Sequence, residues 1–143
     1  MATPRRLPTD EQRMLAAKKE LPIVDIDYSV GDQFEEMYRL QKIMREFFMK
    51  YTKLGMKNQH ERTEYYCMSI ISEACELLEN VRGWKPHQRN TPPVDMANVH
   101  EELSDMMHFL LNLYLEWDID TETAYEDYHK KHMINRKRQQ DGY

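Results

Sequence analysis

Apolar side chains recur every three or four residues along three long segments of this chain, which is the spacing of an amphipathic α-helix. We expect these helices at residues 32–55, at 59–82, and from about residue 95 through Tyr114. A more polar helix is expected at 120–139, and a short one at 11–20. Residues 84–94 contain three prolines and must form a loop. No strand hairpin, repeat or glycine-rich phosphate loop is found, so the chain is predicted to be an all-α bundle of four to five helices.

The length of 143 residues is that of one domain. We expect an N-terminal arm, short helix and connector over residues 1–30 and a helical domain over 31–143. Asp32 with Glu35 resembles a capping box, and Gly55 and Gly83 are expected to end their helices. Several helices are apolar on more than one stripe, which favours a homodimer or a higher homo-oligomer.

The composition excludes several classes of protein. No apolar run approaches the length of a membrane span, and the formal net charge of −5 argues against a protein held to nucleic acid by phosphate contacts. Cys67 and Cys75 lie two helical turns apart, too far for a disulfide, and are expected to be buried thiols. The N-terminus has no apolar stretch typical of a secretory signal, so a cytoplasmic location is predicted.

Charge is strongly segregated near the C-terminal end. Residues 90–129 contain ten acidic residues and no Lys or Arg, a formal −10, while residues 130–138 contain five basic residues, a formal +5. Two interpretations stay open: a solvated acidic helix with a basic tail, or an acidic metal site beside a cationic phosphate clamp.

Two pairs of carboxylates carry the candidate chemistry. Glu73 and Glu76 are three residues apart on one predicted helix face, and Glu102 and Asp105 repeat this spacing on the next helix. If the two helices pack antiparallel, the four acids converge, and converging carboxylates need cations to remain ionised. Oxygen ligands favour Mg²⁺, with Mn²⁺ as the alternative. Acids at this spacing also decorate ordinary soluble helices, so the pattern alone is weak.

The segments 72–80, 83–85 and 101–112 resemble the all-α nucleoside triphosphate pyrophosphohydrolases, which include dimeric dUTPases, phage dCTPases and MazG-type enzymes. The shared pattern is E-x-x-E followed by E-x-x-D, here with 25 residues between Glu76 and Glu102. The stretch from Tyr128 to Tyr143 is similar to the nucleotide-binding tail of the dUTPase and dCTPase branch. The resemblance implies a cytoplasmic enzyme, of a bacterial host if phage-encoded, that cleaves dUTP or dCTP to the monophosphate and pyrophosphate.

The resemblance also implies roles for single residues. Glu73, Glu76, Glu102 and Asp105 would be the metal ligands, and Glu73 the catalytic base. Lys131 and Arg138, seven residues apart on one helix face, would neutralise phosphates, with Asn135 between them. Further substrate contacts are expected from Tyr143, Trp84, Lys85, Gln41, His108 and Asn112. Three of these have ordinary structural explanations as well. Trp84 could be a core lid at the helix exit, His108 a surface or core residue, and the Asn112 amide could bond a neighbouring helix.

Two departures from the family pattern bear on the substrate. The chain lacks the Lys- and Gly-rich motif that follows the Gly-Tyr pair in dimeric dUTPases, and Arg45 stands where an Asn is expected after Gln41. A MazG-like enzyme acting on purine dNTPs is therefore the main alternative. A non-enzymatic helical interaction protein is a second alternative. A di-iron carboxylate bundle is a third, but only Glu126 and His129 match its motif fully.

Overall fold

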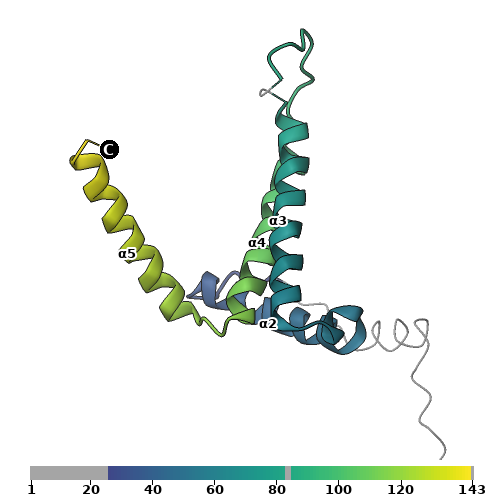
Figure 1. Cartoon of the computed structure of the whole chain (residues 1–143), viewed down its shortest axis with the longest axis vertical. Helices are drawn as coiled ribbons and strands as arrows, with labels where there is room; N and C mark the ends of the chain where they lie inside the picture. The colour runs from purple at the N-terminus through teal and green to yellow at the C-terminus, as the bar shows by residue number, and fades with distance from the viewer. Residues whose placement is uncertain (1–25, 83–84, 143) are drawn as a thin grey trace, which may run out of the picture. The chain divides into compact units, whose positions relative to one another are not determined.

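The computed structural model describes residues 26–82 and 85–142, which form helices, turns and irregular segments without a strand (Figure 1). The predicted all-α fold is confirmed. Four α-helices and one short 3₁₀ helix are present in this part of the chain. The helix predicted at residues 11–20 lies outside the described residues. None of the described helices is long and apolar enough to cross a membrane.

The chain divides into two compact units, Met1–Asn58 and Gln59–Tyr143. The boundary that we predicted near residue 30 falls inside the first unit, and the division into an arm and one domain stays a prediction. The carboxylates of interest all belong to the second unit.

Helix α2 (Gln33–Tyr51) of the first unit starts where the sequence predicts. The Asp32 side chain accepts a hydrogen bond from the Glu35 backbone N–H at 3.0 Å, which satisfies one of the free donors of the first turn. The helix ends at Tyr51 and not at Gly55, where we predicted its end. The reason is that Thr52 takes an extended backbone and caps the start of the 3₁₀ helix η1 (Lys53–Met56). Gly55 is still needed there, since a Cβ at this position would lie 1.9 Å from the Met49 carbonyl oxygen.

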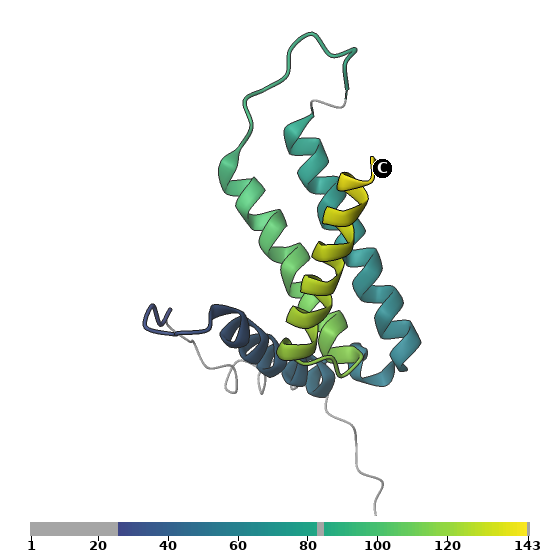
Figure 2. The ribbon, with the colours of Figure 1, turned by 90° about the vertical axis from the view of Figure 1, so that its left-hand side faces the viewer.

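Helices α3 (Gln59–Val81) and α4 (Met96–Glu116) of the second unit pack side by side and antiparallel (Figures 1 and 2). Tyr66, Leu111 and Leu115 are the buried apolar side chains of this hairpin. The predicted loop between the helices is confirmed over its described part, residues 85–95. Gly83, which we expected to end α3, lies outside the described residues, and Arg82 before it takes a left-handed backbone with φ of 48°.

Hydrogen bonds hold both ends of the α3–α4 hairpin. At one end the Arg62 guanidinium donates to both carboxylate oxygens of Glu116, with distances of 2.7–2.9 Å, and the Gln59 side chain donates to the Glu116 carbonyl oxygen. At the other end the Asn80 side chain pairs with the backbone of Asp95, donating to its carbonyl oxygen and accepting from its N–H. These contacts set the lengthwise position of one helix on the other.

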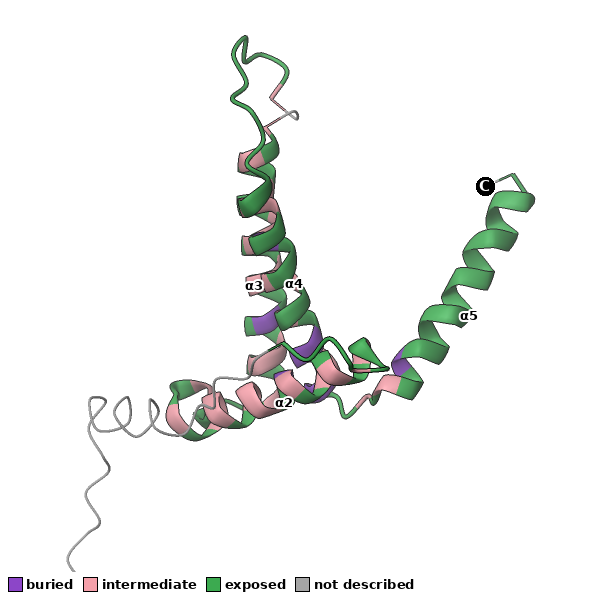
Figure 3. Ribbon diagram, turned by 180° about the vertical axis from the view of Figure 1, so that it is seen from behind, coloured by how far each residue is buried: buried purple, intermediate pink, exposed green. Residues whose placement is uncertain are grey.

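Helix α5 (Thr121–Gln140) is mostly polar, as predicted, and is capped by Asp120. Ala124 is its buried residue, and every described position from Tyr125 to Gly142 is exposed (Figure 3). Within the described part of the second unit, only α3 and α4 pack along each other at length.

The two cysteines differ from expectation. Cys67 and Cys75 are both exposed, although we expected buried thiols. The reason is that α4 covers one face of α3, and the cysteines lie outside that face.

Candidate metal centre

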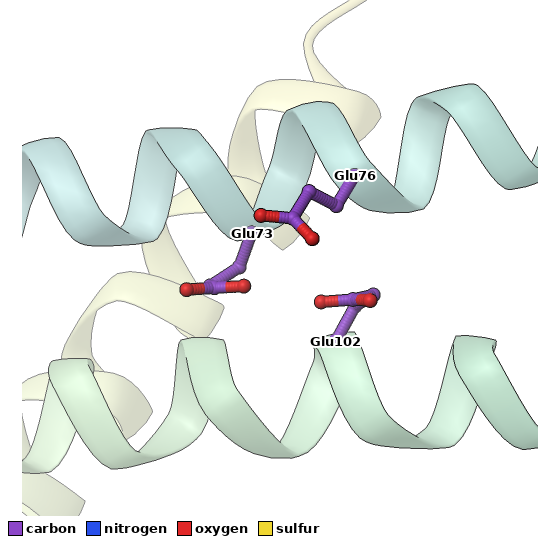
Figure 4. Close-up of side chains that lie close together, drawn as sticks. All are labelled: Glu73, Glu76 and Glu102. Atoms are coloured by element: carbon purple, nitrogen blue, oxygen red, sulfur yellow. The ribbon is translucent and has the colours of Figure 1, made fainter.

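Three glutamates from the hairpin converge between α3 and α4 (Figure 4). Glu73 and Glu76 extend from α3 toward Glu102, which extends from α4, and one carboxylate oxygen of each lies within 4.8 Å of the others. We call Glu73, Glu76 and Glu102 the carboxylate trio. Glu102 is buried, Glu73 half-buried and Glu76 exposed. The spacing of three residues places the α3 pair on one face, and the antiparallel packing brings Glu102 opposite them.

The surroundings of Glu73 shift the pKa of its carboxyl. Partial burial is the main cause that raises the pKa of the Glu73 carboxyl, and a hydrogen bond with Glu102 adds to it. The negative charges of Glu76, Asp105 and Glu102 raise the same pKa further. Asp105 is half-buried and close enough to act on Glu73, but it is not a member of the trio. Its role as a fourth ligand stays a prediction.

The donor set fits a hard divalent cation. All three side chains offer carboxylate oxygens, which Mg²⁺ and Mn²⁺ prefer over softer ligands. Besides burial, the negative charges of Glu76, Asp105 and Glu102 repel that of Glu73 and so help to raise the pKa of the Glu73 carboxyl. A divalent cation would remove that repulsion, so the residues present suit such an ion.

An open groove of about 570 Å³ adjoins the trio. Glu76 and Glu102 line it together with three residues that we did not predict there, Asn80, Arg82 and Asn98. Asn98 donates from its Nδ2 to Oε1 of Glu102 at 2.5 Å. Asn98 lies four residues before Glu102, and Asn80 four residues after Glu76, so helical spacing was a usable signal for both. Nothing in the sequence pairs Arg82 with the site.

Lys85, a predicted phosphate contact, is half-buried and bonded to a neighbour. Its Nζ donates to both carboxylate oxygens of Glu79, at 2.8 and 2.9 Å, and this contact lowers the pKa of Glu79. Glu79 itself lines the groove. Trp84, the other residue predicted at this loop, lies outside the described residues.

The predicted phosphate contacts of α5 are separate from the trio in this structure. Lys131, Asn135 and Arg138 are all exposed, on a helix without extended packing against α3 or α4 in the described residues. Tyr143 lies outside the described residues.

The other predicted substrate contacts differ in burial. Gln41 on α2 and Asn112 on α4 are buried, and His108 on α4 is exposed. A buried amide needs hydrogen-bond partners, so burial alone does not separate a base contact from a structural role for Gln41 and Asn112. Their assignments stay predictions.

A family model described as dUTPase matches residues 33–127 of the chain. This range begins with α2 and contains the whole α3–α4 hairpin with the trio. No curated protein and no solved structure shows a significant match.

Proposed function

This chain belongs to the dUTPase family, and is thus a nucleoside triphosphate hydrolase of the all-α pyrophosphohydrolase type; on that premise we propose that it cleaves dUTP to dUMP and pyrophosphate with Mg²⁺ in the cytoplasm. The observation that carries the proposal is the carboxylate trio within the matched range. Mn²⁺ is expected to replace Mg²⁺, because both take oxygen ligands.

The residues of the trio have distinct proposed roles. Glu73, Glu76 and Glu102 would hold the divalent cation together with Asp105. The cation, when bound, supplies positive charge to the triphosphate and lowers the pKa of water. Glu73, whose pKa is raised by its surroundings, orients the attacking water and accepts its proton. The water oxygen forms a bond to the α-phosphorus, and the bond from that phosphorus to the bridging oxygen of the β-phosphate breaks.

The substrate would extend from the trio along the adjoining groove. Arg82 lines the same groove as Glu76 and Glu102 and adds a positive charge to it. We propose further phosphate contacts from α5 and from the loop after α3, and nucleoside contacts from buried amides and aromatic side chains. The residues proposed for these contacts are Lys131, Asn135, Arg138, Lys85, Trp84, Tyr143, Gln41, His108 and Asn112.

The match to the dUTPase model favours uracil as the base. Arg45 at a position where we expected Asn leaves cytosine as the competing base, and purine dNTPs as the alternative of a MazG-like enzyme.

We also propose that the enzyme is a homodimer. Large apolar side chains form an exposed stripe on each helix of the hairpin, Met68, Ile71 and Leu78 on α3 and Leu103, Met107 and Leu110 on α4. A second copy covering such stripes would remove them from water.

A panel of the common ribo- and deoxynucleoside triphosphates together with dUTP tests the activity, with separate detection of pyrophosphate and orthophosphate. We expect pyrophosphate and monophosphate from dUTP with Mg²⁺, less from dCTP, and none after Glu102→Ala. Glu101→Ala is the matched control, because Glu101 is the exposed neighbour outside the trio. Release of orthophosphate, or no turnover with either cation, would refute the proposal, and preferred cleavage of dGTP or dATP would support the MazG-like alternative.

A further inference from the structure

Glu102 is the buried member of the trio and has a neutral hydrogen-bond donor beside it. Asn98 lies four residues earlier on α4, so the two side chains share one helix face. The Asn98 amide is half-buried and donates to Oε1 of Glu102 at 2.5 Å. The contact stabilises a carboxylate that has little access to water.

The helical turn that carries Asn98 is itself held in place. The Asp95 carboxylate accepts hydrogen bonds from the backbone N–H groups of Ala97 and Asn98, at 3.0 and 3.4 Å. Asp95 is held in turn by the two hydrogen bonds of its backbone with the Asn80 side chain. The chain of contacts therefore runs from the end of α3 through the first turn of α4 to Glu102.

We propose that Asn98 is a positioning residue that fixes the orientation of the Glu102 carboxylate toward Glu73 and Glu76, and so sets the affinity of the trio for its cation. This inference rests on the proposed function, because it assumes that the trio binds a divalent ion. Without the amide, the Glu102 carboxylate rotates about its terminal bond and must be reordered when the ion binds.

The test measures binding of Mn²⁺ alone to the metal-stripped full chain by calorimetry. Asn98→Ala is the first variant, and Asn98→Leu is the second because leucine keeps the branched shape and the number of side-chain heavy atoms of asparagine without its donor. Both should weaken Mn²⁺ binding by about 10- to 100-fold, the usual loss when a partner of a metal ligand is removed. His100→Ala, on an exposed position of the same helix, should bind Mn²⁺ like the unmodified chain.

Turnover of dUTP at increasing Mg²⁺ distinguishes positioning from a general structural role. The Asn98 variants should need more Mg²⁺ for half-maximal activity, yet kcat at saturating Mg²⁺ should return to within a few fold of the original. Unchanged Mn²⁺ affinity in folded Asn98→Leu, judged by circular dichroism, would overturn the inference while leaving the proposed function intact. If the unmodified chain binds no Mn²⁺ and cleaves no dNTP, the proposed function itself is wrong.

Discussion

At the scale of single residues, the surroundings of Glu73 change its acidity. They raise the pKa of its carboxyl, chiefly through partial burial. A carboxylate with a raised pKa holds a proton more readily near neutral pH, which suits a general base. Glu73 is therefore the residue at which substitution should affect chemistry more than folding.

Glu73→Gln should lower kcat for dUTP by about 10² to 10⁴-fold, the usual contribution of a general base, at saturating Mg²⁺. The amide keeps the shape of the side chain but cannot accept the proton. Steady-state kinetics measure the loss. Glu101→Gln should keep normal activity, and an equal loss in both variants would contradict the specific role of Glu73.

The same residue predicts how stability depends on pH. Because the pKa of Glu73 is higher in the folded chain than in the unfolded chain, folding binds protons, and the metal-free protein should lose stability as pH rises through the raised pKa. Glu73→Gln, which stays neutral, should match the unmodified chain at about pH 4 and be the more stable of the two at about pH 8. Thermal melts in EDTA measure the difference, and adding Mg²⁺ should reduce it.

A pH-independent difference between the two melting temperatures would contradict this prediction. It would mean that Glu73 acts on stability through packing and not through its charge.

At the scale of elements, the α3–α4 hairpin depends on an ion pair at one end. The side chain of Glu116 is 1% exposed and that of Arg62 14%, so the pair is largely removed from water. The hydrogen bonds with Glu116 raise the pKa of the Arg62 guanidinium, which stays charged at any ordinary pH. Breaking the pair would leave a buried carboxylate without its main counter-charge.

Arg62→Ala should lower the free energy of unfolding by about 3–5 kcal/mol, as expected when one partner of a buried ion pair is removed. Urea denaturation measures this loss. The double variant Arg62→Met with Glu116→Leu should recover most of it, because two apolar side chains replace the charges. A loss below about 1 kcal/mol in the single variant would contradict this prediction, because it would mean that the pair stabilises the fold no more than an exposed ion pair does.

Helix α5 gives a contrasting prediction, since its residues are exposed. Lys131→Ala and Arg138→Ala should each raise the KM for dUTP by about tenfold or more, through loss of a charge-assisted contact to phosphate, while the melting temperature stays unchanged. Lys130→Ala is the matched control, because Lys130 on the same helix bonds Glu126 and Asp127. A fall in melting temperature without a change in KM would mean that Lys131 and Arg138 stabilise the fold and do not contact the phosphates.

At the scale of the whole molecule, exposed apolar surface predicts association. Ile71 is 55% exposed and Leu103 50%, and each belongs to one of the stripes described above. Light scattering during size exclusion should give twice the chain mass of 17.4 kDa. Ile71→Glu should shift the protein toward the monomer, because a carboxylate would be buried in the interface. Glu64→Lys, on an exposed polar position of α3, should not.

A mass of one chain for the unmodified protein would contradict the homodimer. The stripes would then be exposed apolar surface without a partner copy.

The sequence by itself determined the helices and the chemistry they carry. Apolar periodicity and caps such as Asp32, Asp95 and Asp120 are local signals, because a helix is built from contacts three and four residues apart. The same spacing placed Glu73 and Glu76 on one face. The family resemblance read from these motifs agrees with the match over residues 33–127.

Only the tertiary structure decided which of these groups meet. How far α3 slides along α4 depends on side chains distant in the sequence, such as Arg62 with Glu116 and Asn80 with Asp95. That alignment brought Glu102 opposite Glu73 and Glu76. It also exposed Cys67 and Cys75, because burial depends on which face a neighbouring helix covers and periodicity alone does not determine this.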